Sequence, residues 1–500
     1  MNIRNVSGFL LVLTMASAST LTLAATCESL ASLAFEDATI TAAQLVAEGA
    51  SNHIGLPAHC RVAATLKPSS DSDIKIEVWL PASDWNGKYQ AVGNGGWAGS
   101  ISYDAMARAL AQGYATSSTD TGHSGGGGSF AFGHPEKVID YAYRSEHEMV
   151  AKSKAIIRAF YGQAPRLSYW NSCSSGGKQG LKEAQRFPAD FDGIIAGSPA
   201  INWTGRAAHA VWTAQAVHRD QASYIPPEKY QVIHNAVLDA CDARDGVKDG
   251  VLEDPTRCSF DPKILECKDG DAAACLTGPQ VEAVRKIYST VINPRTKQEI
   301  FPGLEPGSEL AWNVLAGPQL FGTANDYFKY VVFKNPSWDY RTFNFDQDMD
   351  FTQKVDDGTI NALDPNLKPF FQHGGKLIQY HGWSDWQIAP LSSVHYYESV
   401  VSTLGRANVQ DSYRLFMVPG MGHCGGGEGP NRFDMLGALE DWVEHGKAPA
   451  RIVASRTIDT KERSRPLCPY PQVATYKGPG STDDAANFTC AAPAANARRK

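Results

Sequence analysis

Residues 167–197 read LSYWNSCSSGGKQGLKEAQRFPADFDGIIAG, a stretch in which apolar, small and helix-forming residues follow one another in separate blocks. The pattern predicts a short strand at 167–171, a helix at 175–186 and an apolar strand at 191–197. Strands that alternate with helices are typical of a parallel sheet covered on both faces. The stretch therefore predicts an α/β fold.

The same alternation continues on both sides of this stretch. We expect further strands at 75–80, 88–92, 114–118, 376–380 and 414–418, and helices at 103–112 and 150–161. Between about 200 and 370 the pattern changes to loops rich in Trp, Asp and Pro, which hold four of the ten cysteines. One doubly wound, mostly parallel domain (26–200 and 371–500) with a large insertion (201–370) explains this better than two tandem domains.

The first residues indicate export. Arg4 supplies a positive charge, 9–18 is apolar, and small residues precede Cys27, so we predict a signal peptide at 1–25, with a short membrane anchor as the alternative. Ten cysteines after that segment indicate five disulfides and a secreted or periplasmic protein. A net charge of −7 without a basic cluster argues against nucleic-acid binding, and no later run is long enough to cross a membrane. The oligomeric state stays open.

Two serines compete as a candidate nucleophile. Ser124 lies in GHSGG and fits the G-x-S-x-G pattern, but the glycines that follow it will not start a helix. Ser174 lies in SCSSG, where Ser172 replaces the first glycine, yet it stands between a predicted strand and a predicted helix. The alternative is an ordinary N-cap serine. We predict Ser174 as the nucleophile, because context outweighs the pattern match.

A serine nucleophile needs a base and a group that orients the base. Asp385 follows the strand 376–380 and His423 follows the strand 414–418, in the order Ser, Asp, His that α/β-hydrolases use. A lone loop histidine is usually structural, but one placed downstream of such an aspartate is less often so. Cys173 precedes the serine and Cys424 follows the histidine, so a bridge between them would hold nucleophile and base together, unless these cysteines pair elsewhere.

The Cys-Ser…Asp…His-Cys arrangement resembles the tannase and feruloyl esterase family, and the likeness covers nearly the whole mature chain. The matching stretches are 93–96, 118–123, 185–188, 192–197, 374–378 and 422–424. The departure is Ser172, where the family usually has Gly. Either its extra hydroxymethyl group strains the turn, or the backbone there does not need a positive φ.

The resemblance implies an α/β-hydrolase with a lid domain inserted into it and a structural calcium ion in that lid. The lid segment 242–251 carries three carboxylates within eight residues, which suits a hard cation, although a polar Asp-Gly turn would look similar. The expected ligands are Asp242, Asp245, Asp249 and the carbonyls of Val247 and Val251. The family pattern also suggests the pairs Cys27–Cys60, Cys173–Cys424, Cys241–Cys258, Cys267–Cys275 and Cys468–Cys490.

The oxyanion donors should be backbone N–H groups. We expect one from Ser175, and the other from Gly96 in the loop 95–97, for which a plain glycine turn is the alternative.

These residues predict a secreted serine carboxylesterase with no cofactor in the chemistry, and the resemblance implies that it hydrolyses small esters of aromatic, phenolic acids as a feruloyl esterase or tannase does. The family also contains a mono(2-hydroxyethyl) terephthalate hydrolase, which is an alternative. Less favoured alternatives are a serine peptidase on the same fold and a non-catalytic, calcium-dependent binding module.

Overall fold

The structure is a computed structural model that describes residue 1, residues 25–50 and residues 55–493. The predicted signal peptide lies outside the described residues except at its two ends. Among the residues that are described, no helix combines the length and the apolar character needed to cross a bilayer.

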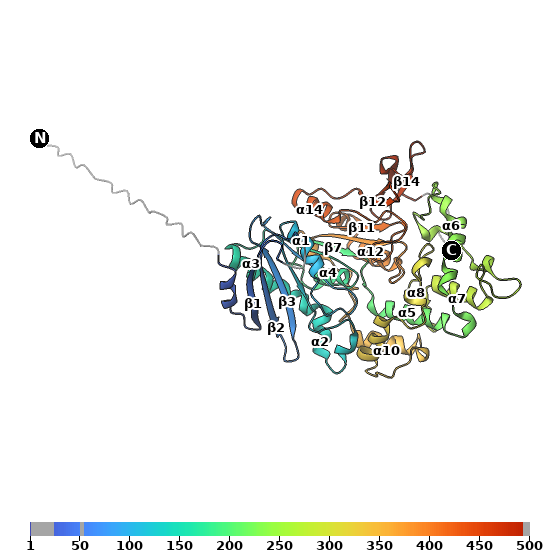
Figure 1. The fold of residues 1–500 in the computed structure, drawn as a ribbon, viewed down its shortest axis with the longest axis horizontal. Helices are drawn as coiled ribbons and strands as arrows, with labels where there is room; N and C mark the ends of the chain where they lie inside the picture. The colour runs from blue at the N-terminus through green and yellow to red at the C-terminus, as the bar shows by residue number, and fades with distance from the viewer. Residues whose placement is uncertain (2–24, 51–54, 494–500) are drawn as a thin grey trace.

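A nine-stranded sheet forms the centre of the molecule (Figure 1). Its spatial order is β1 (Ala38–Val46), β2 (His59–Leu66), β3 (Ile74–Pro81), β5 (Ala115–Thr119), β4 (Lys88–Ala91), β6 (Leu167–Cys173), β7 (Gly193–Gly197), β10 (Lys376–Gly382) and β11 (Tyr413–Val418). The pairs from β1 to β5 are antiparallel, and all pairs from β5 to β11 are parallel. The expected α/β class is confirmed, with three antiparallel strands added at one edge.

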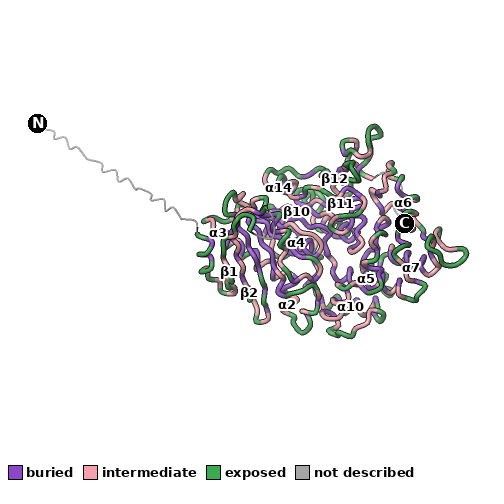
Figure 2. Tube along the Cα trace, in the orientation of Figure 1, coloured by how far each residue is buried: buried purple, intermediate pink, exposed green. Residues whose placement is uncertain are grey.

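Helices cover both faces of the sheet, as the apolar strands require. Neighbouring residues of a strand point to opposite faces, so Trp170 packs with α3 (Ser145–Tyr161), α4 (Ser175–Arg186) and α12 (Leu391–Leu404), while Tyr169 packs with α1 (Tyr103–Ala111) and α14 (Met435–His445). The strands between these helices are buried along most of their length (Figure 2). Two short helices, α2 (Pro135–Ile139) and α13 (Arg406–Gln410), and the hairpins β12–β13 (Ile452–Ile458, Lys461–Leu467) and β14–β15 (Val473–Tyr476, Phe488–Ala491) complete this part.

The segment between β7 and β10 forms a helical unit at the end of the molecule remote from β1 (Figure 1). It has its own core, centred on buried rings such as Trp203, Trp312 and Phe328. Its elements are α5 (Trp203–Val217), α6 (Tyr230–Cys241), α7 (Gly278–Tyr288), α8 (Asn313–Ala316), α9 (Gly322–Asp326), α10 (Gln347–Asp356), α11 (Lys368–Gln372) and the hairpin β8–β9 (Val291–Ile292, Glu299–Phe301).

The structure contains the strands and helices predicted for the sheet domain, but several of them begin or end at other residues than predicted. β6 continues two residues beyond the expected end to Cys173, so the strand reaches the residue before Ser174. α3 begins at Ser145, five residues earlier than its apolar spacing suggested, because its first turn carries the polar residues Ser145 and Glu146 in buried positions. The first shift brings the end of the strand to the candidate nucleophile.

Candidate active site

Ser174 occupies a sharp turn between β6 and α4. Its backbone has φ 62° and ψ −124°, a region that residues other than glycine rarely adopt. The turn is held from both sides, since the Ser174 N–H donates to the Gly197 carbonyl at 2.9 Å and the Ser174 carbonyl accepts from the Ala200 N–H at 3.2 Å. The strained residue thus lifts its hydroxyl out of the sheet, as a nucleophile elbow does.

Ser172 does not need the backbone freedom of glycine. It is a β6 residue paired with Ala196 of β7, and its φ is not positive. Its hydroxyl instead fills the space beside Gly176, where an added Cβ would lie 1.9 Å from Ser172 Oγ. Of the two alternatives for this position, the structure has the one without backbone strain at 172.

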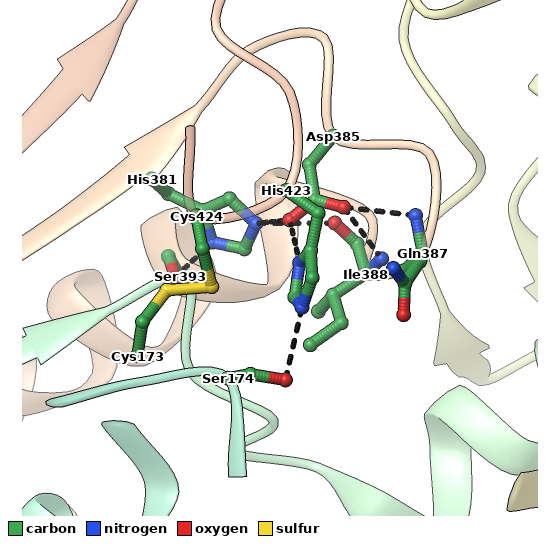
Figure 3. Close-up of a disulfide and its surroundings, with 9 residues drawn as sticks. All are labelled: Cys173, Ser174, His381, Asp385, Gln387, Ile388, Ser393, His423 and Cys424. Carbon is green, nitrogen blue, oxygen red and sulfur yellow. Dashed lines mark hydrogen bonds and ion pairs between the residues drawn. A yellow bond between two sulfur atoms is a disulfide. The ribbon is translucent and has the colours of Figure 1, made fainter. Parts of the chain in front are cut away.

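Three side chains form one hydrogen-bonded chain at the carboxyl ends of β6, β10 and β11 (Figure 3). Ser174 Oγ lies 2.9 Å from His423 Nε2, and His423 Nδ1 lies 2.7 Å from Asp385 Oδ2. Asp385 is fully buried, whereas the His423 side chain remains one-tenth exposed. A serine whose hydroxyl contacts a ring nitrogen, on a ring held by a buried carboxylate, has the geometry for nucleophilic attack assisted by a base.

Both carboxylate oxygens of Asp385 have hydrogen-bond partners. Oδ1 accepts from the backbone N–H groups of Gln387 (2.8 Å) and Ile388 (3.0 Å), and Oδ2 also lies 3.0 Å from Nε2 of His381. Burial alone would raise the pKa of Asp385, but the neighbouring His423 and His381 outweigh it and lower the pKa well below its usual value. The carboxyl group is therefore ionised throughout the ordinary pH range. Sequence analysis missed His381, although it stands four residues before Asp385.

A disulfide joins the residues next to the nucleophile and the base. Cys173 and Cys424 are bonded, with Cα atoms 6.0 Å apart and a sequence separation of 251 (Figure 3). The other four disulfides of the structure are Cys27–Cys60, Cys241–Cys258, Cys267–Cys275 and Cys468–Cys490, the same pairs that the resemblance suggested. Because Cys173 ends β6 and Cys424 follows His423, the bond ties the elbow to the histidine loop.

The loop that carries Gly96 lies against the first turn of α4. The Gly96 carbonyl accepts from the Ser175 hydroxyl at 3.0 Å and from the Tyr141 hydroxyl at 2.7 Å. Asn94 anchors the same loop, since its carbonyl accepts from the Gly176 N–H at 2.7 Å and its N–H donates to Gln179 Oε1 at 3.0 Å. The amide of Ser175 is the first of α4, so no preceding turn supplies it with a carbonyl.

Ser124 takes no part in this chain of hydrogen bonds. It is exposed, and it precedes the glycine turn 125–127 rather than a helix that leaves a strand. The adjacent His123 is buried and packs on Phe130 with ring centroids 3.7 Å apart, while its Nε2 contacts the Trp97 carbonyl at 2.7 Å. The G-x-S-x-G match therefore marks a structural turn.

Four of the five predicted calcium ligands lie around one cavity. Asp245, Val247, Asp249 and Val251 line one small cavity together with Glu253, which the sequence analysis did not name. Asp242 does not line that cavity, and its carboxylate accepts from the N–H groups of Asp249 (3.2 Å) and Gly250 (3.0 Å) instead. Arg465 forms an ion pair with Asp249 at the same place.

A second group outside this loop could also hold a metal ion. Within the described part of the chain, His147, Glu183 and Asp190 bring three ligand atoms within 4.8 Å of one another. His147 Nδ1 lies 2.7 Å from Asp190 Oδ2, and Glu183 is buried. The group spans α3, α4 and the loop before β7.

Comparison with known proteins agrees with this geometry. A family model described as tannase and feruloyl esterase matches residues 60–491. An uncharacterized esterase of Xanthomonas campestris is 38% identical, with 96% of this chain and 92% of that protein covered. A probable feruloyl esterase B-2 of Aspergillus terreus is 34% identical, with 86% of each chain covered.

Solved structures give the same result for the fold. Feruloyl esterase B from Aspergillus oryzae superposes with a TM-score of 0.88 at 33% identity, covering 93% of this chain and 99% of that chain. Tannin acyl hydrolase from Aspergillus niger has a TM-score of 0.80 at 23% identity, covering 93% and 95%.

Proposed function

The chain belongs to the tannase and feruloyl esterase family of carboxylic ester hydrolases, as its motifs indicated, and we propose that it is an exported serine esterase acting on esters of aromatic, phenolic acids. The observation that carries the proposal is the hydrogen-bonded chain from Ser174 through His423 to Asp385 at a strained elbow. Five disulfides support an oxidising compartment.

In the proposed reaction the Ser174 hydroxyl attacks the ester carbonyl while His423 Nε2 takes its proton. Asp385 keeps Nδ1 protonated and stabilises the imidazolium that forms. The N–H groups of Ser175 and Gly96 stabilise the negative oxygen of the tetrahedral intermediate. His423 then gives its proton to the leaving alcohol, and the acyl-enzyme is hydrolysed by a water molecule that His423 activates in turn.

We further propose that residues 201–370 act as a lid that shapes the acyl pocket. Two contacts support this. The Trp97 side chain, next to Gly96, donates to the Thr323 carbonyl at 3.0 Å, and its ring lies 4.8 Å from that of Trp203. Phe321, directly before α9, is only partly buried. Aromatic side chains from the insertion therefore lie beside the proposed oxyanion loop, where an aromatic acyl group can stack.

A substrate panel tests the proposed acyl group. We expect kcat/KM for at least one of methyl ferulate, methyl gallate and mono(2-hydroxyethyl) terephthalate to exceed that for methyl butyrate by about tenfold or more, because burying a ring stabilises binding by roughly 1.5–3 kcal/mol. Initial rates measured by chromatography give the ratios. A preference for methyl butyrate, or cleavage of a peptide panel without ester cleavage, would contradict the proposal.

We also propose a structural calcium ion at the loop 242–251. The cavity offers oxygen donors from Asp245, Asp249, Glu253 and the peptide groups of Val247 and Val251, which suit Ca²⁺, and it is also lined by Arg465, which pairs with Asp249. In this arrangement Asp242 would organise the loop amides rather than bind the ion. When bound, the ion would supply only charge that holds these carboxylates together, so it orders the insertion and takes no part in attack on the ester.

Removal of calcium should lower the thermal stability of the protein and change kcat little. An ion present at about 100 times its Kd stabilises the folded form by about 2.7 kcal/mol, so EGTA should lower the melting temperature while kcat changes little. Asp245→Ala should lower the melting temperature in the same way and make it insensitive to EGTA. Asp269→Ala, at an exposed lid position, is the matched control. An EGTA-insensitive melting curve, or purified protein without calcium by metal analysis, would contradict the site.

A further inference from the structure

A second histidine holds the carboxylate of Asp385. His381 lies near the end of β10 and is fully buried. Its Nε2 is 3.0 Å from Asp385 Oδ2 and 3.1 Å from the Ile388 carbonyl, and its Nδ1 is 2.7 Å from Ser393 Oγ in α12 (Figure 3). Both neighbours of Nε2 accept hydrogen bonds, so Nε2 carries a hydrogen whether the ring is neutral or charged.

This arrangement places Asp385 Oδ2 between two imidazole rings. Oδ2 lies 2.7 Å from His423 Nδ1 and 3.0 Å from His381 Nε2, while Oδ1 is taken by two backbone N–H groups. Without His381, only His423 would contact Oδ2. The carboxylate could then rotate about its Cβ–Cγ bond, and Oδ2 could move away from the His423 ring. Ser393 fixes the His381 ring from its opposite edge.

We propose that His381 is a positioning residue of the site: its Nε2–H donates to Asp385 Oδ2 and fixes the carboxylate in the orientation that holds His423 against Ser174. The inference rests on the proposed function, because it gives His381 a role only through the Ser174–His423–Asp385 chain. His381 does not contact Ser174 and takes no proton from the substrate.

The charges around Asp385 set the direction of the expected pH effect. The groups coupled to its carboxylate are His423 in the loop after β11, His381 in β10 and the buried guanidinium of Arg206 in α5. His381 helps to lower the pKa of Asp385, so its loss should raise that pKa. A carboxylate that can turn away from Nδ1 is the weaker partner for the His423 imidazolium. The acid limb of kcat/KM, which follows loss of the proton from His423, should therefore move to lower pH.

The test compares two substitutions at this position in the full-length enzyme, with methyl ferulate or the best ester of the panel. His381→Leu removes both the donor and the acceptor, and we expect kcat to fall about 100-fold with KM little changed, because misplacement of a catalytic group by about 1 Å has that effect. The acid limb should move to lower pH. His381→Gln carries a donor and an acceptor and should recover most of kcat. His395→Leu, which removes a half-exposed histidine of α12 paired with Glu299, is the control.

Each outcome decides between the alternatives. A folded His381→Leu enzyme with kcat within about twofold of wild type and an unmoved acid limb overturns the inference, as does a folded His381→Gln enzyme no better than His381→Leu. If His381→Leu does not fold, Ser393→Ala replaces it, with a smaller fall in kcat and a shift of the same sign expected. Ser174→Ala is measured beside them: if it is active, the proposed function fails, whereas if it is inactive while His381→Leu is unimpaired, only the role of His381 fails.

Discussion

Replacing Ser174 with alanine is expected to lower kcat by about four to six orders of magnitude, because nothing else in the site can form the acyl-enzyme. The Ser174 side chain makes its hydrogen bond to His423, while the turn itself is held through the backbone. The melting temperature and substrate binding should therefore change little. Initial ester hydrolysis, thermal melting and labelling by a fluorophosphonate measure the three quantities, and the label should map to Ser174 in the wild-type enzyme.

Ser124→Ala is the matched control for this substitution. Ser124 is exposed and stands in the glycine turn that matches the usual motif, so its loss should leave kcat within about twofold. An inactive Ser124→Ala enzyme together with an active Ser174→Ala enzyme would reverse the assignment of the nucleophile. A Ser174 that takes no label, together with no ester turnover, would instead point to a non-catalytic binding module on the same fold.

Removing the Cys173–Cys424 disulfide is expected to weaken both stability and catalysis. The bond closes a loop of 251 residues, and the chain-entropy model gives roughly 5 kcal/mol for a loop of that length as an upper figure. The bonded residues adjoin Ser174 and His423, so the double variant Cys173→Ala/Cys424→Ala should lose kcat as well as melting temperature. Thermal melting and steady-state kinetics at one pH measure the two effects.

The double variant Cys267→Ala/Cys275→Ala provides the comparison. That disulfide spans 8 residues in the insertion and adjoins none of the proposed catalytic residues, so its loss should cost less stability and leave kcat unchanged. Equal effects from the two pairs would show that Cys173–Cys424 has no particular role in catalysis. Peptide mapping without reduction that finds Cys173 linked to another cysteine would remove the structural basis of the prediction.

The local sequence was enough to predict the strands and the helix around Ser174, because the apolar spacing within each segment determines its secondary structure. The strands β6 and β7 and the helix α4 are apolar or amphipathic over their whole length, and the change from strand to helix singled out Ser174 although Ser172 breaks the usual motif. Asp385 and His423 could be predicted because each follows a strand directly, and parallel strands end at one edge of the sheet.

Other parts depend on contacts between segments that the sequence does not bring together. The hydrogen bond from Tyr141 to Gly96 joins positions 45 residues apart, and the one from Asn94 to Gln179 spans 85. His381 looked like an ordinary strand residue, because only the folded turn shows that its ring meets Asp385. In the insertion, α8, α9 and α11 are only four or five residues long, and α5 is buried on nearly all sides, so none of them shows the one-sided apolar spacing that predicts a helix. The cavity beside Asp245 includes Glu253 only through the packing of the loop.

The contact between Ser172 and Gly176 has a consequence for how this site can change by mutation. A methyl group at position 176 would meet Ser172 Oγ at 1.9 Å and Ser172 Cβ at 2.6 Å, and the next neighbour is the Asn94 carbonyl at 3.1 Å. With glycine at 172 only the milder contact remains. The two positions are thus epistatic: with serine at 172, alanine at 176 is strongly disfavoured, so whether position 176 can change depends on the residue at 172.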